Sequence, residues 1–181
     1  ETHPNTLIVI DEAYFEYAFH GDYCTALEFL QTGRQNWMVL RTFSKAWGLA
    51  GLRMGFAVCS NRDLRDALDL TRTPFNTNAL AQYAAATVMS HDSYMKQHVA
   101  HMNSEKTKVE GVLNDARIIF ASSLGNFLFI RCQCSSDEMA ERLLKSGTIV
   151  KPWRQEGFSS FIRVSIGNQR ENNQFLSSFL S

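Results

Sequence analysis

The residues best suited to chemistry surround Lys45. Two hydroxyl residues, Thr42 and Ser44, precede this lysine, and Arg53 follows it eight positions later. A lysine that is desolvated at the end of a buried strand favours its neutral amine, which forms imines with carbonyl compounds. Hydroxyl groups and a guanidinium are suited to holding a phosphate, and the guanidinium can bind it through two parallel hydrogen bonds. The group therefore predicts a site for a carbonyl cofactor that carries a phosphate.

The lysine lies in a loop between two predicted strands. Residues 37–42 include an apolar run that predicts a strand, and the small residues at 46–51 allow the backbone to turn closely. Residues 54–60 predict another strand, and the short connection favours an antiparallel return. The sequence does not contain the pattern G-x-x-x-x-G-K-[ST] of nucleotide phosphate loops.

A second candidate group follows the first predicted strand. Residues 6–10, TLIVI, are continuously apolar and β-branched, which is typical of a strand buried on both faces. A short helix at 25–31 leads from this strand to residues 37–42, so we expect the two strands to be parallel neighbours. Ligands bind beyond the carboxyl ends of such strands, where Asp11 and Tyr14 lie. Taken alone, these residues are more often a loop carboxylate and a packed aromatic ring.

The combined spacing resembles a known family. The pattern SK-x-x-GLAGLR-x-G, with D-E-A-Y beginning 34 residues before the lysine, is similar to the pyridoxal-phosphate (PLP) aminotransferases of fold type I. It is most similar to the histidinol-phosphate aminotransferase group. The resemblance implies that Lys45 forms an aldimine with PLP and is the general base, that Asp11 pairs with the pyridine nitrogen, and that Tyr14 donates to the phenolic oxygen. The implied phosphate ligands are Thr42, Ser44 and Arg53.

The second half of the sequence has the pattern of a small α+β domain. The strand FIRVSIG resembles the family's L-R-[IV]-[ST]-[IV]-G, which implies that Arg163 binds the substrate carboxylate; a structural arginine on a half-buried strand is the alternative. Lys151 stands where the family often has an arginine that contacts the substrate phosphate. Since lysine lacks the bidentate fork, a phosphorylated substrate is left open. The expected strands are 118–122, 126–132, 148–153 and 161–167, with helices at 137–147 and 169–180.

Three helices are expected between these halves. Asn61 is a candidate N-cap for residues 62–72, and the run TPFNTN followed by ALAQ resembles the PFNVN-x-LAQ segment of the same group, with an Asn-capped helix at 79–89. An amphipathic helix at 92–114 should lead from a large domain into a small one. We therefore expect residues 1–95 to be the C-terminal part of the large PLP-binding domain and residues 96–181 to be the small domain.

Composition narrows the class of protein. The 181 residues include 18 basic and 18 acidic side chains, so nothing points to nucleic acid or an anionic membrane. No apolar run approaches the roughly 20 residues of a membrane helix, and residues 1–4 resemble neither a signal nor a transit peptide. A cytoplasmic protein is expected. His91, His98 and His101 fall on or near the helix expected at 92–114. A pair spaced H-x-x-H on a helix can bind a metal, but no third ligand is in view, so we expect solvated histidines and no metal site. We expect reduced thiols at Cys24, Cys59, Cys132 and Cys134.

The expected fold class is α/β, with part of the sheet of the PLP-dependent transferase fold (fold type I) and a small α+β C-terminal domain. The expected activity moves an amino group between an amino acid and a 2-oxo acid, of the histidinol-phosphate or aromatic amino acid type, in histidine or amino-acid biosynthesis. The alternatives are a PLP-dependent lyase of the phosphothreonine decarboxylase type and an inactive truncated polypeptide. The resemblance implies a homodimer for the full-length form.

The resemblance covers only the second half of the family's enzymes. The glycine-rich turn, the aromatic residue that stacks on the pyridine ring and an asparagine beside the phenolic oxygen are expected in the half that has no counterpart here. We therefore expect the 181-residue chain alone to bind PLP weakly, to lack turnover and to be oligomeric or poorly soluble because of the uncovered edge of the strand at 6–10.

Overall fold

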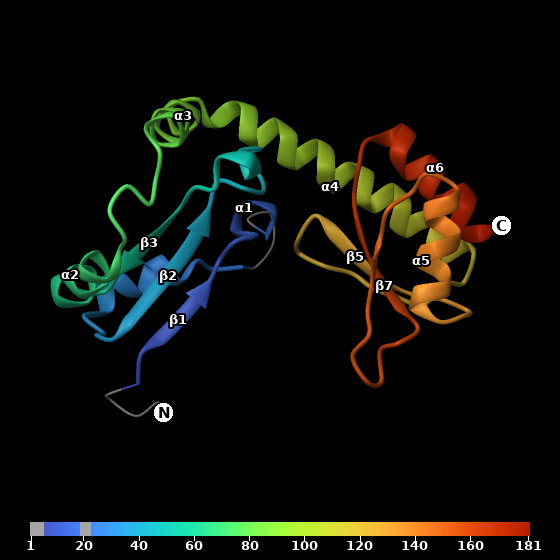
Figure 1. The fold of residues 1–181 in the computed structure, drawn as a ribbon, viewed down its shortest axis with the longest axis horizontal. Coiled ribbons are helices and arrows are strands. Elements are labelled where there is room, and N and C mark those ends of the chain that lie inside the picture. Colours follow the sequence, from blue (N-terminus) through green and yellow to red (C-terminus); the bar gives the residue numbers. More distant parts are fainter. Residues whose placement is uncertain (1–5, 19–22) are drawn as a thin grey trace. The chain divides into compact units, whose positions relative to one another are not determined.

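The computed structural model describes residues 6–18 and 23–181 (Figure 1). Residues 1–4, whose sequence we interpreted as neither a signal nor a transit peptide, lie outside the described residues. The chain divides into two compact units, residues 1–97 and residues 98–181, and each is described by itself.

The first unit is built on a three-stranded sheet of order β1-β2-β3 (Figure 1). β1 and β2 are parallel, with Asp11 opposite Leu40, and β2 and β3 are antiparallel, with Thr42 opposite Gly55. Both predicted pairings are confirmed, although the outer strands are shorter than expected. The strands are β1 (Ile8–Asp11), β2 (Trp37–Thr42) and β3 (Gly55–Cys59).

The prediction that the first strand is buried on both faces is wrong. Ile8 and Ile10 pack against a buried cluster that contains Trp37 and Val39 of β2. The next residue along the other face, Val9, is 50% exposed. The apolar run is continuous, but the described part of the chain covers only one face of it, since β1 alternates between half-buried and exposed residues.

Short helical turns connect the first two strands. The expected helix at 25–31 is a 3₁₀ helix instead, η1 (Ala26–Thr32), which Thr25 caps by accepting a hydrogen bond from the N–H of Leu27. Gly33 ends it in the left-handed conformation, at φ 67°, where glycine has no steric penalty. The single-turn helix α1 (Phe15–Ala18) follows the first strand directly.

Three longer helices follow β3. Asn61 caps the first by accepting from the N–H of Leu64, and Asn78 caps the second by accepting from the N–H of Ala81, so both asparagine caps are confirmed. Within the described residues, no helix combines the length and the apolar character needed to cross a membrane. The helices are α2 (Arg62–Thr71), α3 (Ala79–Met89) and α4 (Asp92–Asp115).

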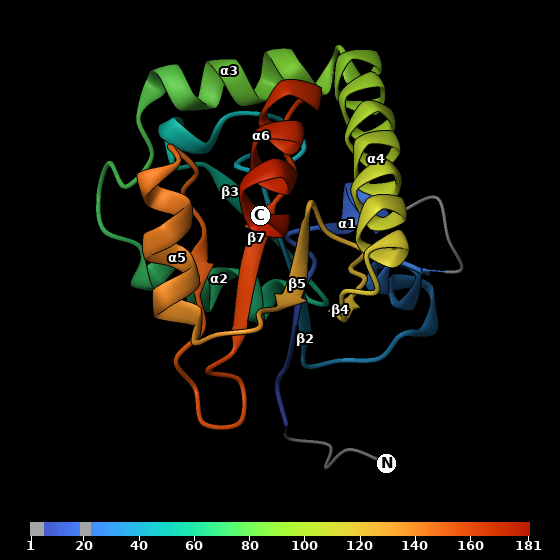
Figure 2. The same cartoon turned by 90° about the vertical axis from the view of Figure 1, so that its right-hand side faces the viewer.

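The second unit is an antiparallel sheet of order β4-β5-β7-β6, with helices packed against it (Figure 2). The strands expected at 118–122 and 148–153 are each only two residues long in the structure, as β4 and β6. The capping box predicted for the last helix is confirmed, because Asn168 and Glu171 exchange hydrogen bonds. The elements are β4 (Phe120–Ala121), β5 (Phe127–Arg131), α5 (Ser136–Lys145), β6 (Lys151–Pro152), β7 (Phe161–Ser165) and α6 (Gln169–Leu180).

Alternation along the central strands separates a core face from a second face. Leu128 and Ile130 of β5 lie opposite Val164 and Ile162 of β7, and all four are buried. Glu105 of α4 is buried as well, and its carboxylate accepts a hydrogen bond from the side-chain amide of Asn172 at 3.0 Å. This bond satisfies a polar group inside the core.

All four cysteines are free thiols in the structure. Cys132 is buried just after β5, and this burial raises the pKa of its thiol to about 11. Cys24 is exposed, whereas Cys59 and Cys134 are half-buried.

Candidate active site

The backbone after β2 folds into a tight turn that carries Lys45. The N–H of Ser44 donates to the hydroxyl of Thr42 at 3.0 Å, and the N–H of Gly48 donates to the carbonyl of Lys45 at 3.0 Å. Gly48 has φ 73°, a conformation that favours glycine. The neighbours of this segment, Phe43 and Ala46, are buried, which anchors the turn while Lys45 stays half-buried at its surface.

Lys45 faces the segment that follows β1. Its Nζ lies 5.3 Å from the centroid of the Tyr14 ring, within the range of a cation–π contact. No described residue gives this amine a hydrogen-bond acceptor. Asp11 ends β1 at the same edge, is exposed, and accepts a hydrogen bond from the N–H of Ala13 at 3.0 Å through Oδ1. Parallel pairing of β1 with β2 therefore brings the lysine, the tyrosine and the carboxylate to one edge of the sheet.

The hairpin between β2 and β3 brings Arg53 back to this edge. Thr42 lies opposite Gly55, and the N–H of Phe43 donates to the carbonyl of Met54 at 3.1 Å. Arg53 is exposed at φ 54°, and its Nη1 donates to the carbonyl of Ala50 at 2.9 Å. This bond engages one nitrogen of the guanidinium and leaves its other N–H groups for an anion.

The approach of the two strands constrains Gly55. A Cβ atom built at this position would lie 2.7 Å from the backbone carbonyl oxygen of Arg41, closer than real side chains come. Glycine at 55 therefore permits the pairing that places Arg53 next to the end of β2.

Sequence reasoning missed the buried carboxylate of Glu12. It accepts hydrogen bonds from Nη2 of Arg41 at 2.8 Å, from the hydroxyl of Thr25 at 2.9 Å and from the N–H of Ala26 at 2.7 Å. Burial alone would raise the pKa of Glu12, but these hydrogen bonds outweigh it, so the pKa lies below its usual value. The guanidinium of Arg41 also lies 3.8 Å from the centroid of the Phe15 ring. Glu12 thus ties η1 to β2 directly beside Asp11.

The two predicted substrate residues lie side by side in the second unit. Lys151 of β6 and Phe129 of β5 are the two register partners of Arg163 in β7. Arg163 is half-buried, with its guanidinium carbon 5.4 Å from the centroid of the Phe127 ring, and Lys151 is exposed. Phe129 in turn stacks on Phe161 with 4.8 Å between ring centroids. The cations therefore share the face of the sheet opposite its buried aliphatic core.

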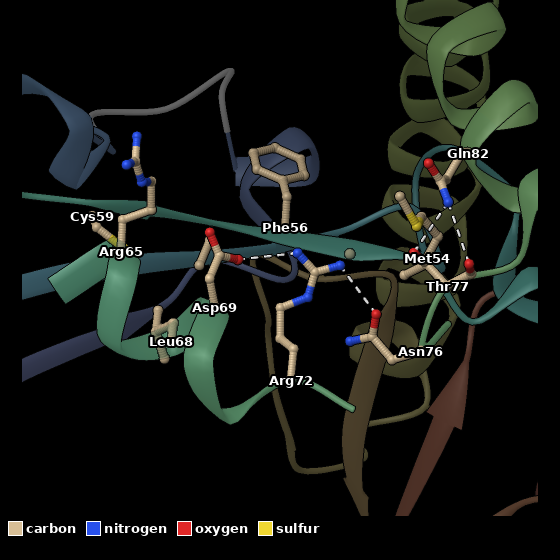
Figure 3. A pocket seen from close by; sticks show the side chains of 12 residues that line it. Met54, Phe56, Cys59, Arg65, Leu68, Asp69, Arg72, Asn76, Thr77 and Gln82 are labelled. Carbon is tan, nitrogen blue, oxygen red and sulfur yellow. Dashed lines mark hydrogen bonds and ion pairs between the residues drawn. The ribbon is translucent and has the colours of Figure 1, made fainter. Parts of the chain in front are cut away.

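A separate pocket of about 440 Å³ opens between β3, α2 and the start of α3 (Figure 3). Three of its polar side chains are already paired with one another, since Arg72 donates to Asp69 at 3.1 Å and to Asn76 at 3.0 Å. None of the eight predicted site residues lines it. In the part of the chain that the structure describes, no three His, Cys, Asp or Glu side chains are grouped to hold a metal ion.

A family model describing aminotransferases of class I and II matches residues 1–179. The chain is a member of this family. It is 50% identical over 171 residues to histidinol-phosphate aminotransferase 1 of Mesorhizobium japonicum, in an alignment that covers 94% of the chain and 47% of that relative. The chain thus spans about half the length of the curated relatives it matches.

Solved structures share the fold of this chain. Histidinol-phosphate aminotransferase from Sinorhizobium meliloti, in complex with pyridoxal-5'-phosphate, matches with a TM-score of 0.85 and 23% identity, covering 98% of the chain and 49% of that structure. L-threonine-O-3-phosphate decarboxylase from Porphyromonas gingivalis matches with a TM-score of 0.81 and 22% identity, covering 97% and 55%. The expected fold class, fold type I of the PLP-dependent enzymes, is confirmed.

The donor set at this edge of the sheet fits the groups of PLP. The Lys45 amine can attach an aldehyde, and the exposed carboxylate of Asp11 keeps one oxygen without a partner among the described residues, so it can accept from a ring N–H. The hydroxyl of Ser44 and the remaining N–H groups of Arg53 can donate to a phosphate. These residues lie on one edge of one sheet.

Proposed function

We propose that this chain is the lysine-bearing part of a PLP-dependent aminotransferase of the histidinol-phosphate type. Its reaction moves an amino group between an amino acid and a 2-oxo acid. The observation that carries the proposal is the half-buried Lys45 amine facing Tyr14, at the edge where β1 ends in Asp11. Similarity to relatives named histidinol-phosphate aminotransferase supports it.

Each residue at the edge has a distinct task. When bound, PLP supplies an electron sink for the charge left at Cα as the proton departs. The Lys45 amine would hold the aldehyde carbon of PLP, with loss of water, and once an incoming amino acid had replaced it there, the freed amine would take the proton from Cα. The Asp11 carboxylate would accept from the pyridine N–H and keep that nitrogen protonated, and the Tyr14 hydroxyl would donate to the phenolic oxygen.

Residues of the turn after β2 and of the hairpin between β2 and β3 would bind the phosphate of PLP. Ser44 offers a hydroxyl donor just after β2, and Arg53 offers the N–H groups that its bond to the carbonyl of Ala50 does not use. The Thr42 hydroxyl donates to the carbonyl of Met54 at 3.4 Å, so it would have to turn from that carbonyl to donate to the phosphate. A charged acceptor makes each such hydrogen bond stronger than one between neutral groups. We assign the first unit to the large PLP-binding domain and the second unit to the small domain.

The second unit would recognise the acidic end of the substrate. Arg163 can form two parallel hydrogen bonds with a carboxylate, and the adjacent Lys151 adds a point charge. The amino-group donor and acceptor are therefore small acids, from histidine or amino-acid biosynthesis. A cytoplasmic location and a homodimeric full-length form complete the proposal, and both rest on the resemblance to the family.

A lyase is the second candidate. The decarboxylase from Porphyromonas gingivalis shares the fold, and Lys151 departs from the arginine of the histidinol-phosphate group. Product analysis separates the two activities, because an aminotransferase needs a 2-oxo acid for repeated turnover. Release of carbon dioxide from an amino acid without any 2-oxo acid would favour the lyase.

Reductive labelling tests the attachment point. The purified protein is incubated with PLP, reduced with borohydride and mapped by peptide mass spectrometry. We expect the pyridoxyl label on Lys45, its loss in Lys45→Ala and its retention in Lys96→Ala, which removes an exposed lysine paired with Asp92. A label concentrated on another lysine would overturn the proposed function.

A further inference from the structure

We propose that the hydrogen bond between Trp47 and Glu16 is a positioning contact that holds the Lys45 amine in place against Tyr14. Nε1 of Trp47 donates to Oε1 of Glu16 at 2.9 Å, and both side chains are half-buried. The inference rests on the proposed function, since it concerns how the attachment lysine is held.

The contact joins two segments that the sheet itself does not pair. The ladder between β1 and β2 ends with Asp11 opposite Leu40, followed by one more bond from the N–H of Glu12 to the carbonyl of Leu40 at 2.9 Å. Beyond that point the chain leaves β1 as a single helical turn and leaves β2 as the turn at 43–49. Side-chain contacts must therefore fix the distance between these two segments.

Two contacts with matching spacing bridge the segments. Tyr14 meets Lys45, and two positions further along each segment Glu16 meets Trp47. The ring of Trp47 also packs on the buried ring of Phe43, with centroids 5.9 Å apart. The Trp47 ring thus packs against the turn through Phe43 and is hydrogen-bonded to α1 through Glu16. Together these two contacts restrain the backbone that carries Lys45.

The indole has two separable roles, packing and hydrogen bonding. Trp47→Phe keeps an aromatic ring against Phe43 and removes the N–H donor. Glu16→Ala removes the acceptor, whereas Glu16→Gln keeps an amide oxygen that can still accept the bond. A positioning role through this bond predicts that Trp47→Phe and Glu16→Ala behave alike and that Glu16→Gln rescues the effect.

The main experiment measures attachment and does not depend on turnover. Each variant is incubated with PLP at one subsaturating concentration, reduced with borohydride, and quantified for the label on Lys45. We expect the labelled fraction to fall about five- to tenfold in Trp47→Phe and in Glu16→Ala, which lies within the roughly two- to twelvefold range of one lost hydrogen bond of ordinary strength. The double variant should fall no further, and Glu16→Gln should stay within about twofold of the unmodified protein.

A matched control separates positioning from stability. Trp37→Phe also removes an indole N–H, which donates to the carbonyl of Arg34 at 2.9 Å, but at the other end of β2. It should lower the melting temperature and leave the label on Lys45 unchanged. Equal loss of label in Trp37→Phe and Trp47→Phe, or multiplicative losses in the double variant, would overturn the positioning role.

Hydrogen exchange without PLP gives an independent readout. The N–H groups of Gly48 and Leu49 are bonded within the turn, to Lys45 and Phe43. We expect both to exchange faster in Trp47→Phe and Glu16→Ala. Unmodified protein that takes no label on Lys45 would refute the proposed function, while unchanged protection of these amides would refute the positioning contact.

Discussion

Lys151 lies directly opposite Arg163, where β6 pairs with β7. Directly opposed residues of antiparallel strands project on the same face, so the two cations flank one patch of the sheet. Arg163 is the more enclosed of the two, since it is half-buried beside the Phe127 ring, and Lys151 is exposed. The two cations should therefore contribute unequally to binding an acidic substrate.

We expect Arg163→Ala to raise the KM for the amino acid about 10- to 100-fold, because each lost hydrogen bond to a charged group costs about 1.5–3 kcal/mol. Lys151→Ala should raise it no more than about fivefold, as expected for an exposed charge pair. Steady-state kinetics on the full-length enzyme, into which the same substitutions are introduced, give both values. Lys145→Ala, which removes an exposed lysine of α5, serves as the control. Loss of PLP from Arg163→Ala would show instead that Arg163 is structural.

Asp11→Asn should slow the chemical step while leaving Lys45 able to take up PLP. A neutral amide cannot hold the pyridine nitrogen protonated, so the electron sink weakens. The fall should appear in the single-turnover rate and in kcat more than in KM. Rapid mixing of the loaded enzyme with an amino acid measures it, and a single-turnover rate equal to that of the unmodified enzyme would contradict the role of Asp11.

Glu12→Gln should lower the free energy of unfolding by about 3 kcal/mol, because it leaves the guanidinium of Arg41 without its charge partner in a largely buried site. Denaturant unfolding at neutral pH measures the loss. Glu28→Gln, which changes an exposed carboxylate on η1, should have little effect.

The contribution of the Glu12 carboxylate to the free energy of unfolding should also depend on pH. Its pKa in the folded protein lies below the ordinary value of 4.5, so its stabilising contribution is fully present above that value. The contribution is lost as the pH falls through the folded-state pKa. The unfolding free energies of the unmodified protein and of Glu12→Gln should therefore converge on acidification, and a difference that stays constant down to low pH would contradict this account.

Local signals predicted much of the fold. Asparagine caps at Asn61 and Asn78 depend on residues three positions away, and these were confirmed. The parallel and antiparallel pairings around β2 followed from the lengths of the connections. The group of predicted site residues at one sheet edge follows from the same pairings, although their roles stay predictions.

Long-range side-chain contacts could not be predicted in this way. Glu12 and Arg41 are 29 positions apart, and Glu16 and Trp47 are 31 positions apart, so each pair depends on strand register that no local pattern encodes. The exposure of Val9 was not predicted, because the sequence indicated a strand buried on both faces. A run of apolar residues shows what a strand could bury, but the neighbouring segments determine what it does bury.

The 181-residue chain alone should self-associate and show no measurable turnover. β1 is an edge strand in the described sheet, and Val9 is 50% exposed beside that edge. Unpaired edges with apolar side chains favour intermolecular pairing, and a lysine there opposes it. Val9→Lys should therefore shift the protein toward monomer in sizing experiments.

Val112→Lys makes the same substitution on α4, at a valine that is 40% exposed, and should not change the assembly. A monodisperse monomer of the unmodified chain that binds PLP at micromolar concentration and turns over would contradict the prediction.

The buried thiol of Cys132 is a built-in probe of local unfolding in the second unit. With a pKa of about 11, only about one molecule in ten thousand carries the reactive thiolate at pH 7 while the unit is folded. Exposed Cys24 reacts with an alkylating reagent without waiting for any opening. When the core around β5 recloses faster than the reagent reacts, the rate of Cys132 modification relative to Cys24 reports the fraction of molecules that are open there, and so the local stability of that core.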